Sequence, residues 1–473
     1  MMPPGRIAAD QRPLVAAIVL LVVSLCLGGG GSAHRIAELM VEMTAILVMA
    51  LTFAWPLPTK AARLLQFPLI LLCLWALLIL VQLVPLPPSI WRALPGRELA
   101  GAIADQIGTG TQPHPLSLAP SATRRALAAL LPAMSMLLLV LHMDRFQRSA
   151  LAVTATGCAF ASLMLGLLQL ITPGHWGTLY HEGHLGYATG FFANRNHQAS
   201  LLLIGAALTC GFASKRNTAT ARSLLLILVI ASLLAGALAT RSRAALLLFP
   251  VALLPLLQGR LRLEWRVVLV TVLVGAAGLW SLIATNQVTQ IAVDRLWNGN
   301  MGRLTFWQDS WTIISRYWPA GTGFGTFATV FRVSEPLEHV GQHYVNHAHN
   351  EFLEVMVEGG LPALVLLLAG FGWWLTKASV FWQAPDSSSR LGAAAWTGLL
   401  LLMLHSLVDY PARMLPIAVM AAILIGFLLP PATRVAGSGR LESLSFGTKQ
   451  RRRRISKAYA KRAPNARDDG KTQ

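Results

Sequence analysis

Apolar residues occur along the chain in long runs that are separated by short polar breaks. About a dozen of these runs come close to the roughly 20 residues that a helix needs to cross the hydrocarbon of a bilayer. They lie near 13–31, 37–56, 67–87, 125–143, 149–172, 197–214, 222–240, 244–257, 267–284, 359–376, 391–409 and 413–430. The pattern predicts an all-α, polytopic membrane protein with about 12 transmembrane helices.

The composition supports the same class. Of the 473 residues, 55% are hydrophobic and 12% are charged, and the mean hydropathy is +0.56. Soluble globular chains carry a larger share of charge. All four cysteines fall inside apolar runs, so the sequence predicts neither a disulfide framework nor a thiolate zinc site.

The net charge of +19 comes from basic residues that gather on one side of the predicted membrane. With both termini in the cytoplasm, the cytoplasmic segments hold Lys60, Arg63, Arg145, Arg148, Lys215, Arg216, Arg222, Arg260, Arg262, Arg266, Lys377 and Arg390. This positive-inside distribution accounts for the charge without a nucleic-acid partner. The basic tail, 431–473, is expected to be disordered. It is either drawn to anionic lipid head groups or solvated so that it only sets the topology, and the second interpretation is the favoured one.

One transmembrane domain, 1–430, is expected, with sizeable segments outside the membrane near 88–124, 173–196 and 285–358. The segment 285–358 is too long for a simple connection, and its many aromatic residues argue against disorder. Apolar positions from Arg303 to Trp318 recur at spacings of three and four, which predicts an amphipathic helix near the outer interface. The glycines of "GTGFG", 321–325, then indicate a closely packed turn, since the lysine of a nucleotide-binding loop is absent.

The sequence "NHAHNEFLEVMVEGGLPAL", Asn346–Leu364, puts two histidines and three carboxylates ahead of an apolar run. If a helix begins near Asn346, His349 lies at the membrane surface and faces the spans. A histidine with a pKa of roughly 6.5 is mostly neutral at neutral pH and accepts a proton, which suits a general base. The alternative is an interfacial histidine that only caps or hydrogen-bonds locally.

A second histidine pattern points to metal binding. His339, His343 and His347 are four residues apart, a spacing that places ligands on one helical face. Gly341 and its β-branched neighbours make a poor helix there, and no carboxylate stands at a known metal spacing. We therefore expect no metal.

Arginines gather at the predicted outer ends of the spans. They are Arg195, which precedes Asn196 and His197, the turn residues Arg241 and Arg243, and Arg303 in the amphipathic helix. Guanidinium forks match phosphate oxygens, so convergent arginines near a membrane surface predict a phosphate-bearing ligand. Taken singly, each arginine would merely extend to the interface. His405 and Asp409, four residues apart at an outer helix end, form either part of the same cavity or an ordinary helix-end pair.

Several of these segments resemble the O-antigen ligase and polysaccharide polymerase superfamily of bacterial membrane glycosyltransferases. They are "GFFANRNHQASLL", "TRSRAALL", "RLTFWQDSWTIISRYWPAGTGFGTF", "HNEFLEVMVEGGLPAL" and "PLSLAPSATRRALAALL". The resemblance extends from about Pro115 to Pro430. Arg195 stands where many relatives have proline, and Ala363 where a glycine is common.

The resemblance implies a GT-C-like fold of many helices in the bacterial inner membrane, with catalysis on the periplasmic face. It implies a glycan donor linked through diphosphate to undecaprenol, without metal or cofactor. Carried over by position, His349 is the catalytic base, and Arg243 and Arg303 hold the diphosphate. The expected site is completed by Arg195, Arg241, Asn350, His347, Asn196, His197 and His405.

The resemblance thus predicts a metal-independent, inverting glycosyltransferase that moves a glycan to a hydroxyl of lipid A-core, an O-antigen ligase. A polymerase that extends the lipid-linked glycan, or an oligosaccharyltransferase that modifies protein hydroxyls, would share the donor site and differ in acceptor. The alternative from another class is a lipid-linked glycan transporter, which the scarcity of charges in mid-span disfavours. The acceptor stays open, because specificity is usually carried by loops.

Overall fold

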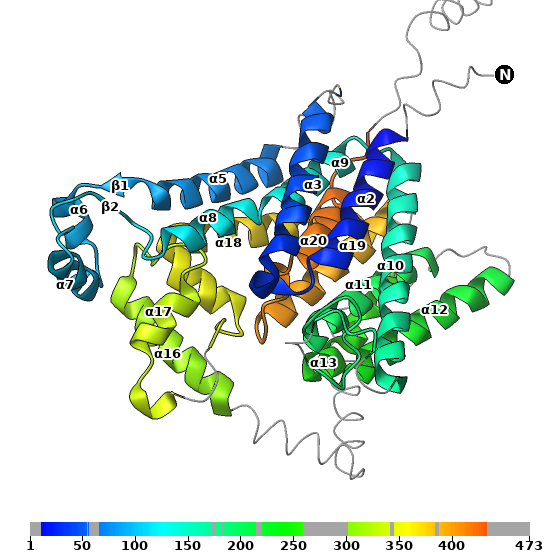
Figure 1. Cartoon of the computed structure of the whole chain (residues 1–473). Helices are drawn as coiled ribbons and strands as arrows, with labels where there is room; N and C mark the ends of the chain where they lie inside the picture. The colour runs from blue at the N-terminus through cyan, green and yellow to red at the C-terminus, as the bar shows by residue number, and fades with distance from the viewer. Residues whose placement is uncertain are drawn as a thin grey trace, which may run out of the picture. The chain divides into compact units, whose positions relative to one another are not determined.

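The computed structural model describes residues 11–53, 55, 66–172, 176–180, 184–213, 220–258, 301–340, 345–383 and 387–432, all in one unit, Met1–Ala432. These residues are mostly helical (Figure 1). The first helices are α2 Arg12–Leu27, η1 Gly31–His34, α3 Arg35–Phe53, α5 Gln66–Leu83, α6 Pro88–Ala93, α7 Glu98–Gln106, α8 Pro120–Ala128, α9 Leu131–Leu141 and α10 Arg145–Ile171. Two short strands, β1 Pro85–Leu86 and β2 His114–Pro115, pair antiparallel.

The second half of the described chain is also helical. Its helices are α11 Arg195–Ala213, α12 Thr220–Ala239, α13 Arg243–Ala252, η3 Leu254–Leu257, α16 Met301–Tyr317, α17 Phe327–Ser334, η4 Leu337–His339, α18 Glu351–Gln383, α19 Ser387–Ser406, η5 Pro411–Arg413 and α20 Leu415–Phe427.

Among the described residues, five helical stretches are long and apolar enough to cross a membrane. They are Arg35–Phe53, Pro120–Leu141, Arg145–Ile171, Ala221–Ala239 and Glu351–Trp382. Shorter apolar helices cover Arg12–Leu27, Phe67–Leu83, Arg243–Leu257 and Leu415–Phe427. This set is typical of a multi-pass membrane protein. The run at 267–284 lies outside the described residues, so the total of about twelve spans stays a prediction.

Helix α11 is buried on all sides. Every side chain from His197 to Gly211 is buried, because α10, α12, α13 and α19 all pack against this helix. A helix that is apolar around its whole circumference belongs inside a bundle, and its small residues let the neighbouring helices approach. The polar residues at its start, Arg195 and Asn196, are therefore fixed by a rigid central element.

The helix predicted between Arg303 and Trp318 is confirmed as α16. Ile313, Ile314 and Tyr317 are buried against α17 and α18, whereas Trp311 is 58% exposed. A tryptophan at a membrane interface also gains from facing outward, where its ring meets the head groups.

The glycine turn after α16 packs against α18, as the sequence predicts. Gly321 has φ +75°, and a Cβ there would lie 2.6 Å from the carbonyl oxygen of Glu358. Gly360 in turn has φ +58°, and a Cβ on it would lie 2.1 Å from the carbonyl oxygen of Pro319. Only glycine fits either position. The turn thus fixes a kink in α18, just after its first two turns.

Candidate active site

The loop that carries both histidines of the "NHAHNE" sequence is not helical. Helix α18 begins at Glu351, so the expected start near Asn346 is wrong. The reason is local: Oδ1 of Asn350 accepts hydrogen bonds from the backbone N–H groups of Phe352 (3.1 Å) and Leu353 (3.2 Å), which caps the helix. His349 precedes this cap with φ +49°, a left-handed conformation that is uncommon outside glycine. Asn350 therefore positions the helix start.

His349 is held by a buried carboxylate. Its Nδ1 lies 3.3 Å from Oδ1 of Asp409, while its side chain stays 24% exposed and that of Asp409 only 1%. Burial opposes ionisation of Asp409, but the hydrogen bond from His349 and the nearby histidines lower the pKa of this carboxyl far below its usual range. An ionised carboxylate only accepts, so His349 donates from Nδ1 and leaves Nε2 as the proton acceptor.

Asp409 also connects His349 to the buried helix α11. Its second oxygen, Oδ2, accepts a hydrogen bond from Nδ2 of Asn196. On the other side of His349, the ring of Phe306 on α16 stacks at 6.5 Å, and Nε1 of Trp307 donates to the carbonyl of Ala348 at 3.1 Å. Helices α11 and α16 therefore both lie at His349.

His347 occupies a different environment from His349. Its Nδ1 lies 2.7 Å from Oε1 of Glu354, which is 1% exposed, and its ring lies 4.0 Å from the ring of Tyr410. The other oxygen of Glu354 accepts from the backbone N–H of Ala348 at 3.0 Å. The contacts of His347 with Glu354 and Tyr410, together with the contact of His349 with Asp409, fix this loop in place.

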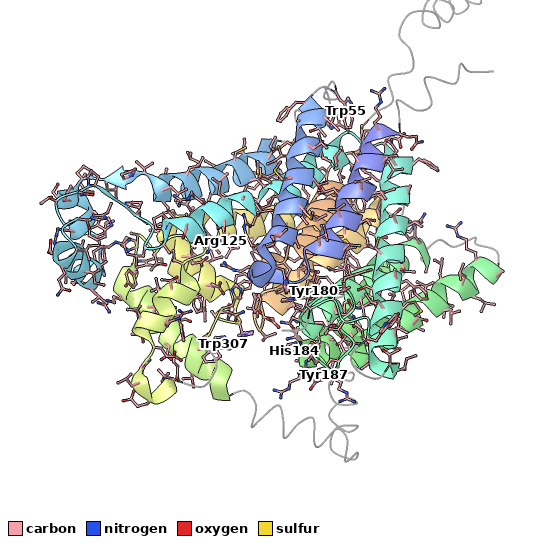
Figure 2. All side chains as sticks on the ribbon, viewed as in Figure 1. Trp55, Arg125, Tyr180, His184, Tyr187 and Trp307 are labelled. Carbon is pink, nitrogen blue, oxygen red and sulfur yellow. The ribbon has the colours of Figure 1, made fainter. Side chains whose placement is uncertain are left out.

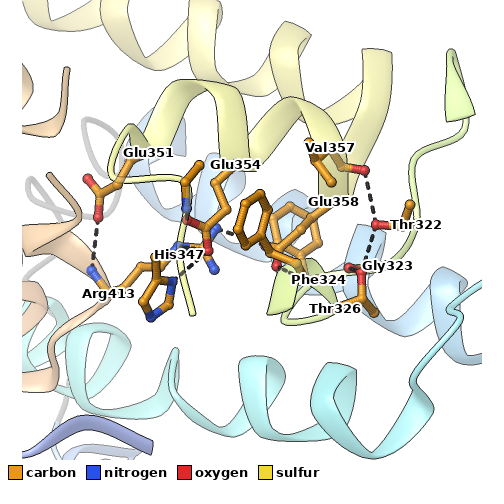
Figure 3. A network of polar contacts seen from close by, with 12 residues as sticks. Thr322, Gly323, Phe324, Thr326, His347, Glu351, Glu354, Val357, Glu358 and Arg413 are labelled. Atoms are coloured by element: carbon orange, nitrogen blue, oxygen red, sulfur yellow. Dashed lines mark hydrogen bonds and ion pairs between the residues drawn. The ribbon is translucent and has the colours of Figure 1, made fainter. Parts of the chain in front are cut away.

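Three carboxylates on one face of α18 converge on Arg413, which follows α19 (Figure 3). Arg413 Nε lies 3.2 Å from Oε1 of Glu354, and its terminal nitrogen donates to Oε2 of Glu358 at 2.8 Å. Oε1 of Glu351 accepts from the backbone N–H of Arg413 at 3.0 Å, and its other oxygen from Ser406. We call Glu351, Glu354, Glu358 and Arg413 the carboxylate network. It ties α18 to the segment that carries Asp409.

Two of the predicted arginines meet at one aromatic ring. The guanidinium of Arg195 lies 4.1 Å from the centroid of Tyr187 and that of Arg241 lies 5.9 Å from it. Figure 2 shows Tyr187 close to His184. Within the described residues, neither arginine has a carboxylate partner. We call Arg195, Arg241 and Tyr187 the arginine face.

The arginine face lies near His349 and Asp409. Burial lowers the pKa of His184, Arg195 lowers it further, Asp409 opposes this, and His349 adds a smaller lowering. Arg195 also directly precedes Asn196, which bonds Asp409. The backbone N–H of Arg195 donates to Nδ1 of His184 at 3.3 Å, and the ring of His184 lies beside that of Tyr187, so His184 contacts the arginine face directly.

Part of the chain matches a known protein family. A family model described as O-antigen ligase matches residues 223–368, the part of the chain with Arg241, α16 and both histidines of the loop. Residues 223–368 thus match the O-antigen ligase domain family, and we call this range the O-antigen ligase domain. Such domains occur in O-antigen ligases and polymerases, glycosyltransferase-like enzymes whose substrates are lipid-linked glycans. A comparison with curated proteins found no match.

The O-antigen ligase domain does not contain all of the candidate site. Arg195, Asn196, Asp409 and Arg413 lie outside the matched range, on elements before and after it. The site is therefore assembled from the domain together with α11 and the segment between α19 and α20.

His197 and His405 are both buried beside this assembly. The ring of His197 lies 5.0 Å from that of Tyr410 and against Phe192, and neither of its nitrogens has a hydrogen-bond partner among the described residues. Nδ1 of His405 lies 2.7 Å from Oγ of Ser200. Both histidines are buried, so their role is to pack against the residues of the site and not to contact a substrate.

For Arg243 and Arg303, which were predicted to bind the donor, the structure gives the position on a helix. Arg243 is the first residue of α13, whose start is capped by Oγ of Ser242, accepting from the N–H of Ala245 at 3.4 Å. Arg303 lies in the first turn of α16, one turn before Trp307, and its side chain falls outside the described part.

The two described histidines of the predicted metal pattern, His339 and His347, have different partners. His339 ends the short helix η4 and pairs with Asp309 at 2.9 Å, whereas His347 pairs with Glu354; His343 lies outside the described residues. In the described ranges, no three His, Cys, Asp or Glu side chains are grouped to hold a metal ion.

Sequence reasoning missed the carboxylate network, Tyr187 and Tyr410, and it treated Asp409 only as a possible partner of His405. The available signal was the spacing of Glu351, Glu354 and Glu358, which places three carboxylates on one helix face ahead of an apolar run. Three carboxylates at the edge of a membrane require a cation, and Arg413 precedes the last apolar run.

Proposed function

We propose that this protein transfers a glycan from undecaprenyl diphosphate to a hydroxyl of lipid A-core, as an O-antigen ligase of the bacterial inner membrane. The observation that carries the proposal is the partly exposed His349, oriented by buried Asp409 and placed beside the arginine face. In this proposal the site faces the periplasm, about 12 helices span the membrane, and both termini and the basic tail 431–473 are cytoplasmic.

His349 acts as the general base. The acceptor hydroxyl is a poor nucleophile until its proton leaves, and Nε2 of His349 takes that proton as the oxygen approaches the anomeric carbon. Asp409 holds the ring in the tautomer that accepts at Nε2 and stabilises the imidazolium that forms. The positive φ of His349 and the capping by Asn350 fix the direction of the ring.

The arginines stabilise the leaving group. As the new bond to the anomeric carbon forms, the bond from that carbon to the diphosphate oxygen breaks, and its electron pair stays on the diphosphate. Arg195, Arg241, Arg243 and Arg303 are proposed to receive this charge, which is larger in the transition state than in the ground state. Attack opposite to the leaving group inverts the anomeric centre.

An apolar cleft offers a place for the polyprenyl chain of the donor. It has a volume of about 460 Å³ and lies between α11, α12 and α13, with lining residues that include Ile230, Leu234, Leu238 and Phe249. All of its lining residues are apolar, and Leu238 stands three residues before Arg241 on the chain. A donor with its diphosphate at the arginine face would thus place its isoprenoid units along α12.

Reconstitution in liposomes tests the proposal. The vesicles contain undecaprenyl-diphosphate glycan with or without lipid A-core. The protein is wild type, His349→Ala or the control His339→Ala, whose histidine pairs with Asp309 and not with Asp409. We expect product on lipid A-core for wild type and control, none for His349→Ala, and no change with a chelator.

Other outcomes assign other functions. Longer lipid-linked chains without lipid A-core would identify a polymerase, and product only on added protein would identify a protein oligosaccharyltransferase. Movement of donor across the bilayer without any transfer, unaffected by His349→Ala, would identify a transporter and overturn the proposal.

A further inference from the structure

A cavity of about 240 Å³ lies where the ends of α10, α18, α19 and α20 meet. Its basic lining comes from Arg145 and Arg148 at the start of α10 and from Lys377 on α18. Its apolar lining includes Val380, Phe381 and Phe427, and no carboxylate among the described residues lines it. The cavity therefore combines three positively charged side chains with an apolar surface.

Arg148 is the buried part of this charge. Its side chain is 3% exposed, and it donates to the carbonyl oxygens of Val140 (3.2 Å), Pro430 (3.0 Å) and Leu429. Its Nε has no hydrogen-bond partner among the described residues, and no described carboxylate pairs with it. A buried guanidinium without a counter-charge is unfavourable, so an anion in the adjoining cavity would stabilise it.

The cavity lies at the opposite end of the helices from His349. Glu351 opens α18 at the candidate active site, and after the kink at Gly360 the helix continues for about 17 residues to Lys377, roughly 25 Å, which is most of the roughly 30 Å of a hydrocarbon core. Helix α10 runs the other way: Gln169, near its end, donates to the carbonyl of Gly190 just before α11, whereas Arg145 opens it at the cavity.

Tryptophans also gather at this end of the helices. Lys377 lies 5.4 Å from the ring of Trp373, and the rings of Trp374 and Trp396 stack at 4.3 Å. Tryptophan is enriched where hydrocarbon meets the head groups. The basic end of the cavity thus lies at the depth of a phospholipid phosphate, with its apolar wall towards the acyl chains.

We propose that this cavity is a binding site for an anionic phospholipid, whose phosphate contacts Arg145, Arg148 and Lys377. Arginine forks match phosphate oxygens, and the lysine adds a point charge. A lipid fits better than a free phosphate, because Val380, which is 55% exposed, and Phe381 offer apolar surface that only acyl chains would cover. The site is separate from the donor site and does not depend on glycan transfer.

Native mass spectrometry of the full chain in detergent tests this site. The protein is titrated with phosphatidylglycerol or with phosphatidylcholine of the same acyl chains. Because Arg148 caps the end of α20, the test variant is Arg145→Gln with Lys377→Gln, and Arg222→Gln, exposed at the start of α12, is the control. The basic tail is present in every variant, so its own lipid binding cancels.

Wild type should bind its first phosphatidylglycerol more tightly than phosphatidylcholine. The double variant should weaken that binding by about tenfold, and the control by less than about twofold. Equal binding of the two lipids, or equal weakening in double variant and control, would overturn the proposal. Displacement of phosphatidylglycerol by millimolar inorganic phosphate would also overturn it, because the cavity would then recognise a free anion.

Discussion

The carboxylate network and the arginine face lie at the same end of the helices, yet their arginines have different partners: carboxylates in the first and an aromatic ring in the second. Arg413 contacts Glu354 and Glu358 with its side chain and Glu351 with its backbone. Arg195 and Arg241 have only the ring of Tyr187 beside their guanidinium groups and, in the described part of the chain, no carboxylate.

This difference separates a structural cation from a ligand-binding one. The charge of Arg413 is used within the protein, so it holds α18 and the Asp409 segment together and has little left for a substrate. Among the described residues, no neighbouring acid balances the charges of Arg195 and Arg241, and the ring of Tyr187 lies beside both guanidinium groups. An incoming diphosphate would supply the missing negative charge.

Replacement of Arg413 should have the largest effect of the four changes below. Arg413→Met leaves Glu354 and Glu358 as buried carboxylates without a cation, which costs roughly 3–5 kcal/mol in the free energy of unfolding. Thermal unfolding in detergent measures this loss. Arg413→Lys keeps the charge and should lose less. A melting temperature for Arg413→Met equal to that of wild type would mean that the network is not structural.

Replacement of Arg195 should lower activity and leave stability unchanged. Arg195→Gln removes a guanidinium from the proposed diphosphate site, for which we expect kcat/KM for the donor to fall about 10²-fold, or about 2.7 kcal/mol. Kinetics with lipid-linked donor, together with a melting curve, separate the two effects. Arg316→Gln is the matched control, because Arg316 is an exposed arginine that faces Glu98. A loss of stability without loss of activity would place Arg195 in the structural class.

Replacement of Gly360 tests whether the kink in α18 positions the carboxylate network. Gly360→Ala forces a side chain into a left-handed conformation and against the carbonyl oxygen of Pro319, at a cost of about 1–3 kcal/mol. We expect a lower melting temperature, accompanied by lower activity, because the kink follows directly after Glu358. Gly372→Ala on the same helix, where a Cβ would meet nothing within 4 Å, is the control. Equal melting temperatures for the two variants would show that the kink is not set by this contact.

Glu351 should be the least sensitive member of the network. Its oxygens accept from Ser406 and from the backbone N–H of Arg413, and Glu351→Gln keeps one of these acceptors. We expect a loss of about 1 kcal/mol in the free energy of unfolding. Chemical unfolding of Glu351→Gln beside Glu354→Gln gives the comparison. A larger loss for Glu351→Gln than for Glu354→Gln would contradict the central position given to Glu354.

The helical elements followed from the sequence, because runs of apolar residues and their polar breaks are local signals. The buried helix α11, the helix α16 and the glycine turn at Gly321 were predicted in this way. The start of α18 was placed too early, since the capping by Asn350 decided it and the apolar spacing did not. Periodicity alone does not mark such a start.

The contacts of the site were less accessible to sequence reasoning. Arg195, Asn196 and His349 were selected by residue type and by resemblance, but the link through Asp409 joins positions 60 and 213 residues apart. Arg413 meets Glu358 across 55 residues. No local pattern encodes which acid neutralises which base at such separations, so the division between structural and ligand-binding arginines required the structure.

The central claim is that His349 and Asp409 act as one unit in glycan transfer. A double-mutant cycle of kcat/KM with lipid-linked donor and lipid A-core, using His349→Ala, Asp409→Ala and the combined variant, tests it most directly. Each single change should lower kcat/KM by at least about 10²-fold, and the combined variant should be no slower than His349→Ala alone. Losses that multiply in the combined variant would contradict the account, because the two residues would then act independently.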